Sequence, residues 1–404
     1  MSQSSRAALA AAVLALAALG GAAPPAPRSP YPLAPDGSGE CTFPMKEQIA
    51  DRPWALQRVV LEALWARGKG EGVRVAVIDT GVDRANPQLA GALDTGAGRD
   101  FVAPEGGDGT HDTVGHGTKV AGLIAARPRQ GTGFVGLAPG ATVIPIRQND
   151  GRATGNAVAT LARAVDHAVA KGARVINISQ DTDAPLTPDS ELGRAVRRAL
   201  AARAVVVASA GNDGLRGHKR RTYPAAFPGV LAVASSDRNN ERADFSQPGD
   251  FIGVAAPGVD MVSTVPGFGQ CIDNGTSFSA PYVAGVAALL VAAHPQWTPQ
   301  EVVWQIQNTA ERSVKGRDDY VGWGVVDPVR AVTQDDGPPE PPVPDPGPPP
   351  AAAPQPAALP VSETARERDE RIGTYALGIT GVLVAVVAGT ARVLRDARGG
   401  GRTG

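Results

Sequence analysis

The chain has 404 residues and a formal net charge of −1, with 39 Lys and Arg against 40 Asp and Glu. This balance argues against nucleic-acid binding, so no nucleic-acid partner is expected. Hydrophobic residues make up 43% of the sequence, which is enough for one large folded domain with appended segments.

The N-terminus is typical of a secretion signal. Arg6 precedes an apolar run over residues 7–19, and small residues follow at positions 20–23, where a signal peptidase could cut. We therefore expect a signal peptide over residues 1–23, with a buried N-terminal helix as the alternative. Residues 24–53 would then be an extension that is too short for a compact prodomain and is expected to lie along the following domain.

The sequence contains only two cysteines, Cys41 and Cys271. An even number of cysteines in an exported protein favours a disulfide bond, because compartments outside the cytoplasm are oxidising. We predict that Cys41 and Cys271 are bonded to each other, with two buried thiols as the alternative.

Short apolar runs alternate with helical patterns in the middle of the chain. The runs are rich in β-branched residues and lack polar alternation, as expected of strands covered on both faces. They lie at residues 73–78, 142–147, 174–179, 204–209 and 230–235. The helical patterns lie at residues 116–126, 154–171 and 188–203. In the third pattern, Thr187 is the expected N-cap and Pro188 the first helical residue. This order predicts an α/β domain over residues 54–334, a parallel sheet with helices on both faces.

Three polar side chains stand at the ends of these elements, where ligands bind in such sheets. Asp79 follows the strand "VRVAVI", His116 opens the helix in "GHGTKVAGLIAA", and Ser277 opens the helix in "GTSFSAP". A serine hydroxyl becomes a nucleophile when a histidine takes its proton and a carboxylate orients that histidine. Backbone N–H groups at a helix N-terminus favour the negative charge that then develops. Asn212, in "SAGNDG", would supply a further donor to this oxyanion.

Nearby residues offer weaker alternatives. Asp83 lies past the turn that follows the first strand, and His111 lacks the helix-opening context of His116. Ser279 lies two positions beyond Ser277, so the two serines cannot share one helix face. No metal or other cofactor is expected, because no His or Cys cluster has the spacing of a metal site.

The C-terminal part contains a second apolar segment. Residues 335–371 form a linker that begins rich in Pro, Ala and Gly and ends charged. Residues 372–391 carry no charge and are long enough to cross a bilayer. The tail, residues 392–404, has four arginines and one aspartate, which favours a cytoplasmic location. We therefore predict a single-pass membrane protein whose folded domain faces outward; the alternative for the apolar segment is a buried core helix.

Four motifs in this order resemble those of the subtilisin-like serine proteases: "VAVIDTGVD", "GHGTKVAGLIAA", "ASAGN" and "NGTSFSAPYVAGVAALL". The resemblance covers residues 54–331 and implies a subtilisin-like fold and a serine endopeptidase whose triad is Asp79, His116 and Ser277. Three further features narrow the resemblance to one group within this family: the stretch "RPWALQRVVLEALWARGKGEGVRVAVIDTGVD", the proline-rich linker and the single C-terminal membrane helix. They make the chain most similar to mycosins, the membrane-anchored subtilases of type VII secretion systems.

The same resemblance implies a substrate-binding segment. In subtilases, the strand end after a buried Asn-Ser motif forms one wall of the primary specificity pocket and pairs with the substrate backbone. Here that segment is Ser179, Gln180 and Asp181, and Gly211 lies beside the oxyanion motif. Relatives often have glycine where Asp181 stands. Asp181 would fill the pocket or place a negative charge in it, so the enzyme would prefer substrates with a small or basic side chain before the scissile bond. The alternative is that Asp181 turns to solvent.

These observations predict a membrane-anchored endopeptidase outside the cytoplasm that processes exported proteins at a type VII secretion system. Its partners would be protein or peptide substrates and membrane subunits of the secretion complex. One alternative is a structural subunit that stabilises the complex, with proteolysis secondary. Another is a general degradative protease, which the membrane anchor disfavours.

Overall fold

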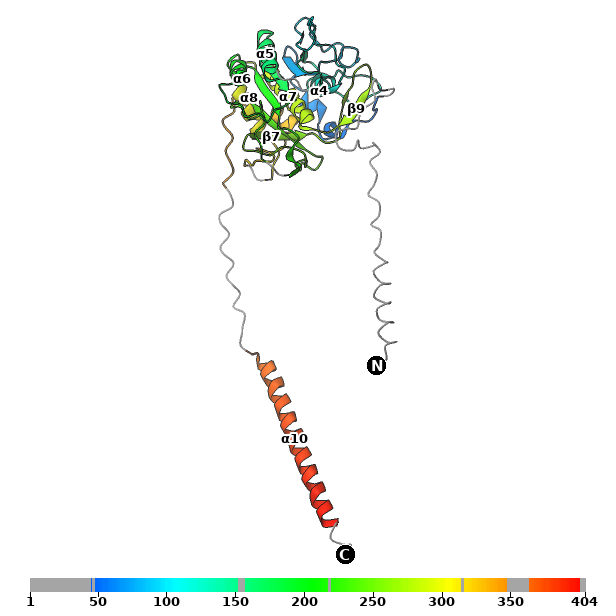
Figure 1. Ribbon diagram of the computed structural model, residues 1–404, viewed down its shortest axis with the longest axis vertical. Helices are drawn as coiled ribbons and strands as arrows, with labels where there is room; N and C mark the ends of the chain where they lie inside the picture. Colours follow the sequence, from blue (N-terminus) through cyan, green and yellow to red (C-terminus); the bar gives the residue numbers. More distant parts are fainter. Residues whose placement is uncertain are drawn as a thin grey trace. The chain divides into compact units, whose positions relative to one another are not determined.

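The computed structural model describes residue 45 and residues 48–151, 157–216, 219–313, 316–346 and 363–399 (Figure 1). Two compact units are present, one ending at Asp345 and the other beginning at Pro346. The predicted signal peptide and Cys41 lie outside the described residues.

A seven-stranded parallel sheet forms the centre of the first unit, with the order β2-β3-β1-β4-β5-β6-β7. Its strands are β1 (Arg74–Asp79), β2 (Arg99–Asp100), β3 (Thr142–Arg147), β4 (Val175–Ile178), β5 (Val205–Ser209), β6 (Leu231–Ser236) and β7 (Ile252–Pro257). After β1 the chain forms β2 and β3 on one side of β1, and then forms β4 on the other side of β1. The carboxyl ends of β1 and β4 therefore lie next to each other where the strand order reverses, which is the usual ligand position in open parallel sheets.

The strands bury side chains on both faces, which explains their unbroken apolar sequences. Val75 and Val77 of β1 face one core cluster, whereas Ala76 and Ile78 face another. The first cluster is covered by α4 (His116–Ala125), α7 (Thr276–Ala293), α8 (Pro299–Thr309) and α9 (Pro328–Thr333). The second is covered by α5 (Ala157–Ala170) and α6 (Glu191–Ala201). The predicted parallel sheet with helices on both faces is thus confirmed.

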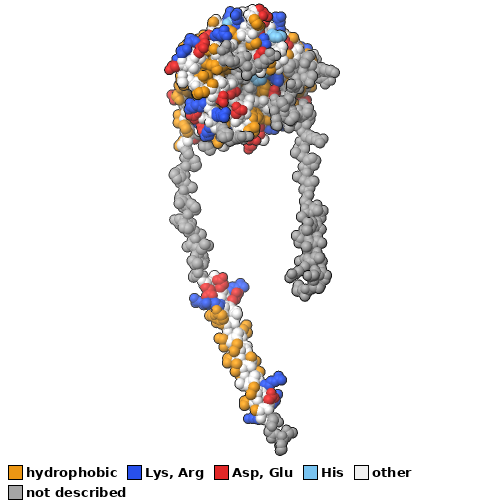
Figure 2. Space-filling model, viewed as in Figure 1, with side chains coloured by type: hydrophobic (Ala, Val, Ile, Leu, Met, Phe, Trp, Pro, Cys, Tyr) orange, Lys and Arg blue, Asp and Glu red, His pale blue; other side chains and the backbone are white. Residues whose placement is uncertain are grey.

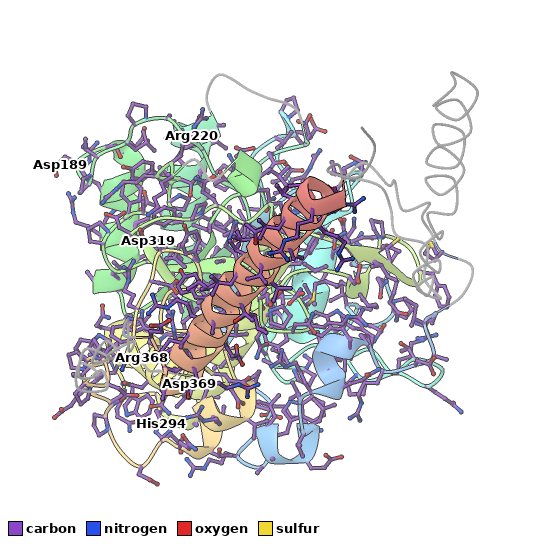
Figure 3. All side chains as sticks on the ribbon, turned by 90° about the horizontal axis from the view of Figure 1, so that it is seen from below. Asp189, Arg220, His294, Asp319, Arg368 and Asp369 are labelled. Carbon is purple, nitrogen blue, oxygen red and sulfur yellow. The ribbon has the colours of Figure 1, made fainter. Side chains whose placement is uncertain are left out.

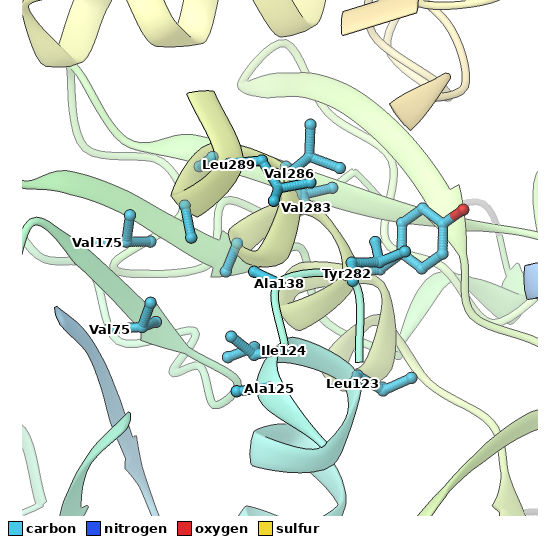
Figure 4. Close-up of a cluster of buried hydrophobic side chains, with 14 of the residues drawn as sticks. Val75, Leu123, Ile124, Ala125, Ala138, Val175, Tyr282, Val283, Val286 and Leu289 are labelled. Carbon is cyan, nitrogen blue, oxygen red and sulfur yellow. The ribbon is translucent and has the colours of Figure 1, made fainter. Parts of the chain in front are cut away.

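Helix α7 is the central helix of the first cluster. Its side chains Tyr282, Val283, Val286 and Leu289 pack beside strand residues such as Val175 and beside the end of α4 (Figure 4). Almost every residue of α7 is buried. This all-round burial explains the absence of a polar face in its sequence, because a helix enclosed by a sheet and other helices has no side that contacts water.

The start of α6 differs from the prediction. The helix begins at Glu191, and its N-cap is Ser190, whose hydroxyl accepts a hydrogen bond from the Gly193 N–H at 3.1 Å. Thr187 is not the cap; its carbonyl accepts from the Ser190 N–H at 3.0 Å, which closes a turn ahead of the helix. Ser and Thr are both good caps, so the tertiary position of the turn decided between them.

A short antiparallel hairpin, β8 (Met261–Thr264) and β9 (Gln270–Asp273), leads the chain into α7. The described end of the N-terminal extension lies against this hairpin. The Met45 N–H donates to the Phe268 carbonyl at 2.8 Å, and the Ile49 N–H donates to Gln270 Oε1 at 2.8 Å. Two short helices, α2 (Trp54–Gln57) and α3 (Leu61–Leu64), then carry the chain to β1.

The second unit contains one long helix, α10 (Ala365–Gly399). Its middle is hydrophobic and charged side chains stand at both ends (Figure 2). Among the described residues, two helices are long and apolar enough to span a membrane. One is α7, of which 83% is buried in the core. The other is α10, which has no buried residue, so its apolar side chains are left for a membrane or a partner to cover.

Candidate active site

The ends of β1 and α4 bring a carboxylate and an imidazole together. Asp79 is the last residue of β1 and His116 is the first of α4. His116 Nδ1 lies 2.7 Å from Asp79 Oδ1, and the side chains are 29% and 2% exposed. The Thr80 N–H also donates to Asp79 Oδ1, at 2.7 Å. A ring that donates through Nδ1 leaves Nε2 as a proton acceptor, so His116 can act as a base through Nε2.

Electrostatics favour the protonated form of this imidazole. Burial of the ring acts to lower the pKa of His116, but the charge and the hydrogen bond of Asp79 outweigh burial, and the pKa lies above its ordinary value. A raised pKa means that the ring binds a proton more strongly. The arrangement thus suits a group that takes a proton during a reaction and is neutral at alkaline pH.

Asp112, which the sequence analysis did not single out, holds the turn before His116. Its carboxylate is buried and accepts from Thr80 Oγ1 at 2.9 Å, the Gly115 N–H at 2.7 Å and the Thr118 N–H at 2.9 Å. Burial raises the pKa of Asp112, while these hydrogen bonds oppose the rise. Because Thr80 follows Asp79, Asp112 links the loop of the carboxylate to the helix of the imidazole.

Ser277 is the second residue of α7, beside the carboxyl end of β4. Its Oγ donates to the Ser179 carbonyl at 3.1 Å, and Ser179 Oγ donates to the Ser277 carbonyl at 2.8 Å. The ring of Phe278, the next residue, lies 5.5 Å from the His116 ring. Within the described part of the chain no hydrogen bond joins Ser277 to His116. Such bonds often tighten only when substrate is bound.

Asn212 is oriented by Thr276. Both the N–H and the Oγ1 of Thr276 donate to Asn212 Oδ1, each at 2.9 Å. A backbone N–H can only donate, so the atom facing it is the amide oxygen and Nδ2 points the other way. The side chain is exposed, which leaves Nδ2 free to donate to a ligand beside Ser277.

Comparison with known proteins shows where this arrangement belongs. The family model of the subtilases, Peptidase S8, matches residues 70–324. The chain belongs to the subtilase family. It is 36% identical to Mycosin-1 of Mycolicibacterium smegmatis over 346 residues, which cover 73% of this chain and 76% of that protein. It is 35% identical to Subtilisin E of Bacillus subtilis over 284 residues, which cover 70% of this chain and 71% of that protein.

Solved structures are also similar to this chain. MycP1 from the ESX-1 type VII secretion system is 35% identical with a TM-score of 0.65, covering 74% of this chain and 90% of that one. A chain of an intact ESX-5 inner membrane complex is 31% identical with a TM-score of 0.63, covering 84% of this chain and 90% of that one. This subtilase is therefore a serine endopeptidase that is homologous to mycosins.

The segment after β4 in this subtilase lies opposite Gly211. Gln180 Oε1 accepts from Asn149 Nδ2 at 2.7 Å. A Cβ added to Gly211 would lie 3.1 Å from Asp181 Oδ2 and 3.1 Å from Thr222 Cγ2. The Asp181 carboxylate thus lies next to Gly211, where the chain continues beyond the ends of β4 and β5. Desolvation, followed by the charges of Asp213 and Asp183, raises the pKa of Asp181 to about 6.

A basic loop lies next to this segment. Arg220 pairs with Asp183 at 3.0 Å, and Lys219 pairs with Asp319 at 2.7 Å; Arg220 and Asp319 are labelled in Figure 3. The N–H groups of Thr182 and Tyr223 also exchange hydrogen bonds with each other's carbonyls, at 3.0 and 2.9 Å. Arg220 and the Thr182–Tyr223 hydrogen bonds therefore support the segment that contains Asp181.

The remaining candidates take structural positions. Asp83 accepts from the Gly267 N–H at 2.6 Å and so holds the turn of the β8–β9 hairpin. Ser279 is buried, and its Oγ contacts Ser235 Oγ at 2.8 Å. Cys271 is buried on β9, while Cys41 lies outside the described residues, so their disulfide stays a prediction. In the described segments, no three His, Cys, Asp or Glu residues could together hold a metal ion.

Proposed function

We propose that Asp79, His116 and Ser277 are the catalytic triad of this endopeptidase. His116 Nε2 takes the Ser277 proton as Oγ attacks the peptide carbonyl. Asp79 stabilises the imidazolium that results, which its 2.7 Å contact with Nδ1 supports. His116 then gives the proton to the departing amine, and water repeats the sequence to release the acyl group. The Asp79–His116 contact is the observation that carries this proposal.

Asn212 and the N-terminus of α7 would stabilise the oxyanion. Asn212 Nδ2 is turned away from Thr276 by the two hydrogen bonds to Oδ1. At the start of α7 the Thr276 N–H donates to Asn212 and the Phe278 N–H donates to the Gly275 carbonyl, so the Ser277 N–H is the group of this turn that would donate to the oxyanion. Donors that are fixed before the reaction need no reorganisation when charge develops. Removing the Asn212 donor should therefore lower kcat more than it raises KM.

Substrate binding would also release the nucleophile. The Ser277 hydroxyl donates to the Ser179 carbonyl in the free enzyme. A substrate strand that pairs with residues 179–181 would present its own N–H to that carbonyl. The hydroxyl would then exchange its acceptor for His116 Nε2, so that the triad is completed only when a peptide occupies the cleft.

We further propose that the enzyme is anchored by α10 and cleaves exported proteins outside the cytoplasm at a type VII secretion system. The unburied apolar stretch of α10 and the arginines after it support this topology. Likeness to MycP1 and to a chain of the ESX-5 inner membrane complex supports the setting. That likeness also favours a second role, in which the protein stabilises the secretion complex.

A serine variant tests both roles. Ser277→Ala should lower peptide cleavage by several powers of ten without unfolding the protein, because the triad acts as a unit. Ser279→Ala is the matched control, because it removes a buried hydroxyl from the same helix and should keep activity. Near-normal turnover in Ser277→Ala would place the nucleophile elsewhere. Secretion that survives in a Ser277→Ala strain but fails in a deletion strain would support the stabilising role.

A further inference from the structure

A partly buried ion pair connects the segments that carry His116 and Ser277. Lys119 Nζ lies 2.7 Å from Asp273 Oδ2, and the two side chains are only 10% and 27% exposed. Lys119 lies about one turn after His116 in α4, and Asp273 ends β9 just before the chain turns into α7. Solvent and salt screen such a pair much less than a surface pair.

Further hydrogen bonds fix both partners of this pair. Asp273 Oδ1 accepts from the Asn274 N–H at 2.8 Å, so both carboxylate oxygens are in use. The Lys119 carbonyl accepts from Ser263 Oγ of β8 at 2.5 Å. Lys119 therefore holds the β8–β9 hairpin through its backbone and its side chain. Because the chain runs directly from β9 into α7, this docking sets where Ser277 lies relative to His116.

Phe278 contacts both the base and the ion pair. Its ring centroid lies 5.5 Å from that of His116 and 6.0 Å from Lys119 Nζ. Phe278 is buried and directly follows Ser277. Lys119, Phe278 and His116 thus form one continuous packed group, and a shift of the ion pair would be transmitted to the imidazole.

We propose that Lys119 and Asp273 are positioning residues of the active site: their ion pair clamps the helix of His116 to the strand that leads to Ser277, and it balances the charge beside His116. This inference rests on the proposed role of His116 as the base. Neither residue belongs to the triad or to the predicted substrate-binding segment.

The two charges act on His116 in opposite directions. The charged groups that face His116 are Asp79, Lys119 and Asp273; Asp112, on the preceding turn, is buried in hydrogen bonds of its own. Burial and Asp79 dominate the pKa of His116, and beyond them Lys119 lowers this pKa while Asp273 raises it. With both partners present the two effects oppose each other. Removing one partner leaves the other uncompensated.

The test is the pH dependence of kcat/KM for a peptide substrate, measured on the full-length protein in detergent. The acid limb of this profile is the fall of kcat/KM at low pH, where His116 becomes protonated. Lys119→Gln should move this limb to higher pH, and Asp273→Asn should move it to lower pH. Each shift should be about half a pH unit, as expected for one nearby charge in a partly solvated site. The double variant should return close to the wild-type limb. Each single variant should also lose roughly 3- to 10-fold in kcat at the plateau, since misplacement of catalytic groups is costly.

Controls separate the clamp from a general loss of structure. Lys119→Arg keeps the charge and must keep the wild-type acid limb. If Lys119→Gln does not fold, Asp273→Asn still tests the predicted shift. Arg197→Gln breaks a pair with Asp189 whose side chains are 49% and 89% exposed, and it should change neither kcat nor the limb. Absent shifts, or shifts in the same direction for both single variants, overturn the inference even when cleavage depends on Ser277. Failure of the triad itself would appear separately, as an active Ser277→Ala enzyme.

Discussion

The glycine after His116, the proposed catalytic base, is where one added methyl group should separate activity from stability. Gly117 follows His116 in α4 and packs on the loop after β1. A Cβ at Gly117 would lie 2.1 Å from the Gly81 carbonyl oxygen and 3.0 Å from the Asp79 Cβ. Nonbonded atoms pack at about 3.5 Å. Gly117→Ala must therefore push the β1 loop and the start of α4 apart by about 1.4 Å, because the carbonyl belongs to the backbone and cannot rotate away.

Two effects on folding oppose each other in this variant. Alanine is a better helix former than glycine by about 1 kcal/mol, whereas overpacking a buried site costs about 1–3 kcal/mol. The net loss of stability should be no more than about 2 kcal/mol. Catalysis is more sensitive, because a shift of about 1 Å in catalytic groups can cost about 100-fold. His116 begins α4 and Asp79 ends β1, so pushing these two segments apart should lengthen their 2.7 Å contact, and we expect a fall in kcat of about that size.

The assay combines kcat and KM for a peptide substrate with thermal unfolding of the same preparation. Gly91→Ala is the control, because a Cβ there would meet no atom within 4 Å, and it should leave both activity and melting temperature unchanged. A folded Gly117→Ala enzyme with wild-type kcat would refute the reasoning. So would a loss of activity that only tracked the unfolded fraction.

Three further predictions follow from other parts of the chain. Asp181→Gly should raise cleavage of peptides with Phe or Leu before the scissile bond by about 10-fold or more, because the carboxylate occupies space opposite Gly211; a wild-type enzyme that already favours Phe would contradict this. Peptide mapping without reductant should recover Cys41 linked to Cys271, a bond worth up to about 4–5 kcal/mol for so long a loop, and two free thiols would exclude it. External protease added to intact cells should remove the catalytic domain and leave a fragment with residues 372–404, whereas full protection would reverse the proposed topology.

The sequence alone determined the α/β architecture and most of its element positions. Unbroken β-branched runs favour strands with two covered faces, and β1, β3, β4, β5 and β6 lie within about one residue of the five predicted runs. The other four strands, β2, β7, β8 and β9, were not predicted. The candidate residues Asp79, His116 and Ser277 were also visible, because each stands at the end of an element next to glycine or threonine. The apolar stretch within α10 was equally plain, since hydropathy needs no tertiary information.

Only the tertiary structure decided how these side chains are held. The Lys119–Asp273 pair joins residues 154 positions apart, and Ser277 finds its acceptor, the Ser179 carbonyl, 98 positions away. Nothing in the sequence distinguishes Asp112 from other aspartates in loops. In the structure its carboxylate is buried, accepts from Thr80 and holds the turn before His116. Periodicity and propensity describe neighbours along the chain, whereas hydrogen bonds and ion pairs depend on which distant segments the packed core brings within 3 Å of each other.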